Sequence, residues 1–221
     1  MTLTEMKAWL DENGIEYKEE TYSYSGEMEE PETEEEIEVQ ETVEQHQVNE
    51  ADFTYSPNDD GTFAITGYTG SEINLIFPST HDDHTVVSIA SNAFKSNTAL
   101  QSAVFPDGLT TIDANAFNGC TSLRHVEFPD SLLSIGKDAF NGCPIEDLVL
   151  PAKVQMVYAG AFNNNNKLTS ITIPKTLVNG GTIIGSPFRY CSNLKEVIFE
   201  EGTTSIAFGL FASVTSLEKA V

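Results

Sequence analysis

The sequence predicts a mainly β solenoid, because one short unit recurs along most of the chain, its apolar pattern is that of strands, and no helical period accompanies it. The clearest mark of the unit is a phenylalanine, preceded by alanine in four copies, that recurs every 22 to 26 residues. These residues are Phe94, Phe117, Phe140, Phe162, Phe188 and Phe211. A fixed period of this size is typical of a solenoid, in which each coil buries its apolar face only against its neighbours.

Each unit begins with a short strand that ends at or near a proline. In Leu168–Pro174, Ile171 and Ile173 alternate with Ser170 and Thr172. Because successive side chains of a strand point to opposite faces, we expect the isoleucines in the core and the polar pair in solvent. Proline ends the strand because it has no N–H group to donate. The repeated strands are expected to form a parallel sheet on the concave side of the coil.

The second half of the unit carries another apolar pair three residues apart, as in Leu109/Ile112 and Leu132/Ile135. The Ala-Phe dipeptide and a polar stretch follow it. β-Branched and aromatic residues dominate, and no segment keeps a helical period over about ten residues. We therefore expect strand-rich coils without a long convex helix, with the phenylalanines stacked on one another in the middle of the coils.

Written as Leu-x-x-Ile-x-Ile-Pro-x-x-Val-x-x-Ile-Gly-x-x-Ala-Phe-x-x-Cys, the unit resembles the BspA-type leucine-rich repeat family of bacterial and protist surface proteins. Leu123 to Cys143 match this pattern nearly throughout. The stretch from Phe53 to Phe94 resembles the segment that starts such arrays, with a hairpin turn at Asp59-Asp60-Gly61 and the run Thr66 to Ser71.

The resemblance covers about residues 51–221. It implies a right-handed leucine-rich-repeat coil with a parallel concave sheet and an N-terminal capping hairpin at 51–77. It also implies adhesion or host-protein binding, and it carries over no catalytic residues. The chain departs from the pattern at Thr80 to Thr85, at Asn179 to Thr182 and at Glu200, where we expect local differences in coil geometry.

The first fifty residues form a small acidic N-terminal segment. They hold 17 acidic and 2 basic side chains, whereas residues 51–221 hold 17 and 9, and the whole chain has a net charge of −23. An apolar stripe from Leu3 to Leu10 predicts one helix. We interpret residues 1–26 as a small helix plus strand segment and residues 27–50 as an acidic linker. The segment is either a spacer or adaptor, or an independent binding module.

The acidic balance argues against nucleic acid and anionic membrane surfaces as partners, because both are bound through basic patches. No apolar run is long enough for a transmembrane helix, so we expect no membrane insertion. Met1 is followed by an amphipathic stretch rather than by a signal peptide. The family resemblance implies a cell-surface or secreted protein, and the missing signal peptide leaves a cytoplasmic location as the alternative.

Three cysteines, Cys120, Cys143 and Cys191, each lie three residues after a repeat phenylalanine. They are expected in one column of small, semi-buried side chains. Cys120 and Cys143 fall one coil apart, within reach of a disulfide, whereas Cys191 falls two coils from Cys143. We interpret all three as free thiols, as in a reducing compartment or an anaerobic source.

Four side chains capable of binding a metal occur together in His81-Asp82-Asp83-His84. Because they are contiguous, the backbone cannot easily converge several of them on one ion, and we interpret the run as the polar tip of an insertion in the first coil. No arrangement typical of a nucleophile, a phosphate loop or paired carboxylates occurs. We expect no metal, no cofactor and no enzymatic activity, with a metal protein or enzyme using this loop as a distant alternative.

The outward positions of the concave strands are the candidate binding surface. One column of these positions is mostly apolar and the other is polar or acidic, as in a groove that binds protein. The candidate residues are Ile76, Ser102, Val104, His125, Glu127, Asp147, Val149, Ser170, Thr172, Glu196 and Ile198. The alternative is that β-branched residues occur there because they suit strands.

Two functional hypotheses follow. The first is a non-catalytic protein that binds a protein ligand through its concave sheet, and the second is a structural spacer or modular repeat segment without a ligand of its own. The sequence reaches Val221 within the next expected strand, without a polar capping unit. We therefore expect either a continuation of the array or self-association through an uncapped C-terminal coil.

Overall fold

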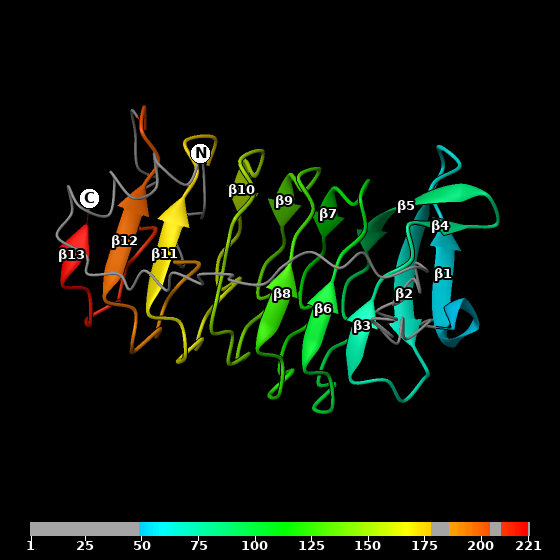
Figure 1. Ribbon diagram of the computed structural model, residues 1–221, viewed down its shortest axis with the longest axis horizontal. Coiled ribbons are helices and arrows are strands. Elements are labelled where there is room, and N and C mark those ends of the chain that lie inside the picture. The colour runs from blue at the N-terminus through cyan, green and yellow to red at the C-terminus, as the bar shows by residue number, and fades with distance from the viewer. Residues whose placement is uncertain (1–48, 178–185, 204–208, 221) are drawn as a thin grey trace, which may run out of the picture. The chain divides into compact units, whose positions relative to one another are not determined.

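The computed structural model describes residues 49–177, 186–203 and 209–220. Over these residues the chain is a β-solenoid of about six turns with parallel strands and almost no helix, which confirms the predicted fold class (Figure 1). The helix and strand expected in residues 1–26, the linker as far as residue 48 and the insertion at Asn179 to Thr182 lie outside the described residues.

The described structure begins with a single 3-10 turn, η1 (Glu50–Asp52), which leads into an antiparallel hairpin. The hairpin consists of β1 (Phe53–Pro57) and β2 (Phe63–Tyr68). The ring of Phe53 packs against the rings of Tyr68 at 4.9 Å and of Phe77 at 5.5 Å, measured between centroids. The hairpin thus supplies aromatic side chains that bury the apolar side of the first coil.

The expected parallel sheet is the first of two ladders of strands, and we call it the first ladder. Its strands follow one another side by side in Figure 1, and two isolated bridges, His125↔Asp147 and Val149↔Thr172, join its two halves. The strands are β3 (Asn74–Ile76), β6 (Ser102–Val104), β8 (His125–Glu127), β11 (Ser170–Ile173), β12 (Glu196–Phe199) and β13 (Lys219–Ala220). In β11 the side chains alternate between exposed and buried as the sequence predicts.

A second ladder runs along another side of the coils. Strand β2 pairs in parallel with β5, and β7, β9 and β10 follow. Its remaining strands are β4 (Thr80–His81), β5 (His84–Ile89), β7 (Thr111–Ile112), β9 (Ser134–Ile135) and β10 (Met156–Val157). The sequence shows the apolar pairs of β7, β9 and β10 but does not predict these strands, because each has only two residues and shows no alternation.

The departure at Thr80 to Thr85 is a small hairpin of its own. Strands β4 and β5 pair as Thr80↔Thr85 and His81↔His84. Asp82 and Asp83 form the two-residue turn between them, with φ angles of 47° and 61°. Positive φ at both central residues is what a tight turn between twisted strands requires, and aspartate tolerates it better than most residues.

The Ala-Phe segments form a third set of hydrogen bonds between coils. In one coil the N–H groups of Asn115, Phe117 and Gly119 donate to carbonyl oxygens of the next coil at 2.9, 2.7 and 2.8 Å. Asn115 and Gly119 have φ angles of 59° and 76°. The left-handed conformation on both sides of the phenylalanine turns every second N–H group toward the following coil, so the bends are hydrogen-bonded to one another.

Gly136 marks a place where two coils approach closely. A Cβ atom at this position would lie 2.6 Å from the backbone nitrogen of Ala114 and from the carbonyl carbon of Asp113. Glycine is therefore required after Ile135 for a steric reason, since the neighbouring backbone atoms cannot move aside as a flexible side chain can.

The repeat phenylalanines stack along the core. Neighbouring ring centroids lie 5.0 to 5.4 Å apart with interplanar angles of 2° to 19° from Phe94 to Phe211. The four central rings are fully buried. Phe77, Phe105 and Phe128, each the last apolar residue of a first-ladder segment, form a shorter stack beside them. Aromatic contact and apolar burial thus couple each coil to the next.

We expect Phe140→Ala to lower the free energy of unfolding by about 3–5 kcal/mol, because it opens a cavity between two stacked rings. Chemical denaturation followed by circular dichroism measures this loss. The matched control is Leu133→Ala, which removes a partly exposed side chain and should cost less than about 1 kcal/mol. Equal losses for the two variants would contradict a central role for the phenylalanine stack.

Candidate protein-binding face

The outward side chains of the first ladder form two columns. The apolar column has one member in each coil, two residues before the proline position, and the polar column lies two residues earlier. The apolar column comprises Ile76, Val104, Glu127, Val149, Thr172 and Ile198, and the polar column Asn74, Ser102, His125, Asp147, Ser170 and Glu196. Strand pairing or an isolated bridge places most members of each column next to one another from coil to coil. The residue between the two columns is buried in each coil.

Three side chains of the apolar column are exposed large hydrophobic groups. The exposed fraction is 57% for Ile76, 75% for Val149 and 40% for Ile198, whereas Val104 is half-buried. Together with Ile73, which precedes β3, they make up four of the seven exposed large hydrophobic residues in the described part of the chain. Glu127 and Thr172 separate them, so the face carries distinct apolar points rather than a continuous stripe.

Three basic side chains on or beside these strands are paired with acids. Arg124 Nη1 lies 2.6 Å from Glu146 Oε1, Lys195 Nζ lies 2.9 Å from Glu218 Oε1, and Lys219 Nζ lies 2.6 Å from Glu196 Oε1. Each pair joins neighbouring coils. Exposed ion pairs of this kind contribute little to stability, but they balance the positive charge of these three side chains.

A pocket of about 500 Å³ opens in the middle of the first ladder. Its lining residues are His125, Val126, Glu127, Phe128, Asp130, Asp147, Val149 and Pro151. It lies between β8 and the following coil, where isolated bridges replace a strand. In that coil Ile145 follows the repeat phenylalanine by five residues rather than six. The sequence shows this shortening, but a one-residue change in spacing does not by itself indicate a pocket.

The structure corrects the expectation of semi-buried cysteines, because Cys120, Cys143 and Cys191 are fully buried free thiols. Each Sγ atom donates a hydrogen bond of 3.1 to 3.2 Å to the carbonyl oxygen of the repeat phenylalanine in the preceding coil. Asn165, in the same column, donates its Nδ2 hydrogen to the equivalent carbonyl oxygen at 2.9 Å. The column therefore satisfies a backbone acceptor in four successive coils, which favours burial of the donor.

Burial raises the pKa of Cys191 from its ordinary value of 9.0 to about 11. A hydrogen bond with Cys120, followed by burial, also raises the pKa of Cys143. We expect the native protein to react slowly with a disulfide reagent near pH 8, because all three thiols are fully buried and the raised pKa of Cys191 reduces its thiolate fraction about a hundredfold. Under denaturing conditions without reductant, three thiols should titrate, and two in a Cys191→Ala control. A single titratable thiol in the wild type would indicate a Cys120–Cys143 disulfide.

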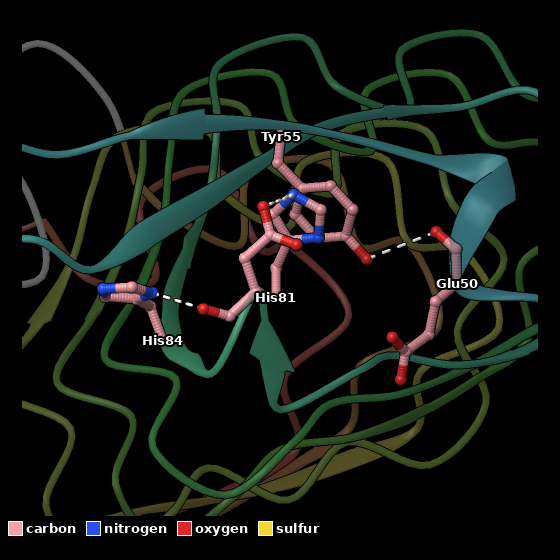
Figure 2. Close-up of polar contacts among 5 residues, drawn as sticks. Glu50, Tyr55, His81 and His84 are labelled. Carbon is pink, nitrogen blue, oxygen red and sulfur yellow. Dashed lines mark hydrogen bonds and ion pairs between the residues drawn. The ribbon is translucent and has the colours of Figure 1, made fainter.

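The histidines of the first-coil insertion pack against aromatic rings. The ring of His81 stacks on the ring of Tyr55 (Figure 2), with a centroid distance of 3.7 Å and an interplanar angle of 8°. Its edge contact with Phe63 has a centroid distance of 5.0 Å. His84 Nδ1 lies at hydrogen-bond distance from the carbonyl oxygen of Asp82. Within residues 49–177, 186–203 and 209–220, no three His, Cys, Asp or Glu side chains are grouped so that they could hold a metal ion.

Tyr55 contributes a second contact to this hairpin region. Its hydroxyl group lies 3.5 Å from the carbonyl oxygen of Glu50 and donates a long hydrogen bond to it. Burial, with a smaller effect of the Glu50 charge, raises the pKa of Tyr55 to about 12. The phenol therefore remains protonated at ordinary pH and joins the first turn to the stacked histidine.

Taken together, these features define a strand-rich leucine-rich-repeat solenoid with one long outward sheet face. The BspA type leucine rich repeat region matches residues 87–218 in six copies. The chain belongs to this family, as its sequence predicts. A comparison with curated proteins found no match. None of the helices in the described residues is long and apolar enough to span a membrane.

Two solved structures extend the comparison. The leucine rich repeat protein of T. pallidum is 30% identical to this chain with a TM-score of 0.72, and the match covers 78% of this chain and 80% of that one. The pneumococcal vaccine antigen PcpA is 20% identical with a TM-score of 0.55, and the match covers 76% of this chain and 42% of that one. The second likeness concerns the fold alone.

Proposed function

We propose that this protein is a non-catalytic leucine-rich-repeat protein that binds another protein through the outward face of its first ladder, in adhesion or host interaction. The single observation that carries the proposal is the exposure of Ile76, Val149 and Ile198 on one sheet face. Large apolar side chains among polar ones are typical of protein-binding surfaces. A cell-surface or secreted location is part of the proposal and rests on the family.

The competing function is a structural spacer whose repeats carry another domain and bind nothing. The distribution of exposed apolar groups favours binding, since a spacer needs no concentration of them on one ladder. β-Propensity alone explains branched residues in strands, but Ile73 precedes β3 and is also exposed. The spacer hypothesis predicts that substitutions on this face have no effect on association.

The test compares capture of proteins by the immobilised full chain with capture by a Val149→Asp/Ile198→Asp variant. Charge placed in a desolvated contact should reduce recovery of a specific partner by at least about tenfold. Val104 is left unchanged because it is half-buried and a charge there would threaten folding. Captured proteins are identified and quantified by mass spectrometry.

The matched control is Leu133→Asp/Tyr158→Asp. These side chains are 39% and 37% exposed and belong to the region of the second ladder, so the control adds the same charge to a different face. A partner lost from the first variant and retained by the control would support the proposal. A partner retained by both variants would place binding elsewhere, and a folded wild type that captures nothing would favour the spacer.

A further inference from the structure

We propose that the partner segment is cationic and extended, and that it places a lysine or arginine side chain in the pocket beside Val149. This inference rests on the proposed function and specifies the chemistry of the partner. Three facts carry it: the carboxylates of the pocket lining form no ion pair with a described residue, the basic residues Arg124, Lys195 and Lys219 of the ladder are paired with other acids, and the most exposed apolar side chain of the face lies in the pocket lining.

The charges around the pocket are unbalanced. Glu127, Asp130 and Asp147 line it, and its lining contains no lysine or arginine. None of the three carboxylates takes part in an ion pair with a described residue. All three residues are exposed, so they remain accessible to a partner. A cationic group that enters the pocket would meet negative charge from two adjacent coils.

The neighbouring positive charges cannot easily supply this balance. Arg124 precedes β8 but pairs with Glu146 at 2.6 Å, and Lys195 and Lys219 pair with acids farther along the ladder. Turning Arg124 toward the pocket would break its contact with Glu146. Complementary charge from outside the chain is therefore the better match, and it would guide association as well as orient the bound segment.

The apolar part of the pocket fits the stem of the same side chains. Val149 is exposed, and Val126, Phe128 and Pro151 contribute further apolar surface to the lining. Lysine and arginine bury their methylene groups along apolar surface while the charged end remains hydrated or paired. A segment that lies along the ladder would also reach the exposed Ile198 or Ile76 with its other side chains.

The experiment measures binding of a short fluorescent peptide of alternating lysine and valine to the full chain by anisotropy. Companion peptides replace each lysine with serine or with glutamate. We expect the lysine peptide to bind best, and its affinity to fall when salt is raised from about 0.05 M to about 0.5 M, because screening weakens contacts between exposed charges. Preference for the serine or glutamate peptide would overturn the cationic partner.

The site is tested by Glu127→Gln/Asp147→Asn, which keeps the size of both side chains and removes two charges. We expect about a tenfold weaker complex with the lysine peptide, from two lost contacts between exposed charges. The matched control, Asp59→Asn/Asp83→Asn, makes the same charge change at exposed turn residues away from the pocket. Equal weakening by both variants, or none by either, would overturn the pocket as the site and indicate attraction by net charge.

Failure of this inference is distinguishable from failure of the proposed function. If the serine peptide binds as well as the lysine peptide and Val149→Asp abolishes binding of both, the face binds extended peptides, but the proposed preference for a cationic side chain is overturned. If no peptide binds, or if a captured partner is unaffected by Glu127→Gln/Asp147→Asn, the cationic segment is also overturned. Only the capture experiment with Val149→Asp/Ile198→Asp decides whether the face binds protein at all.

Discussion

The stack of repeat phenylalanines is the interaction on which the rest of the fold depends. Its rings repeat at 5.0 to 5.4 Å, close to the spacing of neighbouring strands in a sheet, about 4.8 Å. Aromatic stacking and strand pairing are therefore satisfied by the same rise from coil to coil. Both ladders and the hydrogen bonds between the Ala-Phe bends follow this rise, so a change in one coil is felt by its neighbours.

Because the inward side chains hold the coils together, the outward side chains of the first ladder are free to bind a partner. Leu75, Ala103 and Val126 point inward and are buried, whereas Ile76 and Glu127, the residues that follow two of them, are exposed. Substitutions on the outward side change charge and apolar contact without opening the core. The fold thus presents an extended row of side chains whose chemistry can differ from coil to coil while the backbone remains regular.

The most distinctive part of that row is the coil that follows β8, where the repeat spacing and the strand pairing become irregular. Ile145 arrives one residue early, the strand that should follow β8 is reduced to two bridges, and the pocket opens there. Val149 is the most exposed apolar side chain of the face, and unpaired carboxylates surround it. The loss of strand pairing and the surplus of negative charge occur in the same coil. A cationic partner segment is therefore proposed to bind there.

The sequence alone determined the family, the mainly β solenoid, the inward and outward alternation of the first ladder and the phenylalanine stack, because these follow from a period and from local side-chain chemistry. Tertiary structure decided the second ladder, the full burial of the cysteines and the pocket. Strands of two residues, such as Ser134–Ile135, carry too little pattern to be predicted. The environment of Cys120 is set by the carbonyl oxygen of Phe94, and that contact exists only after one coil has packed on the next.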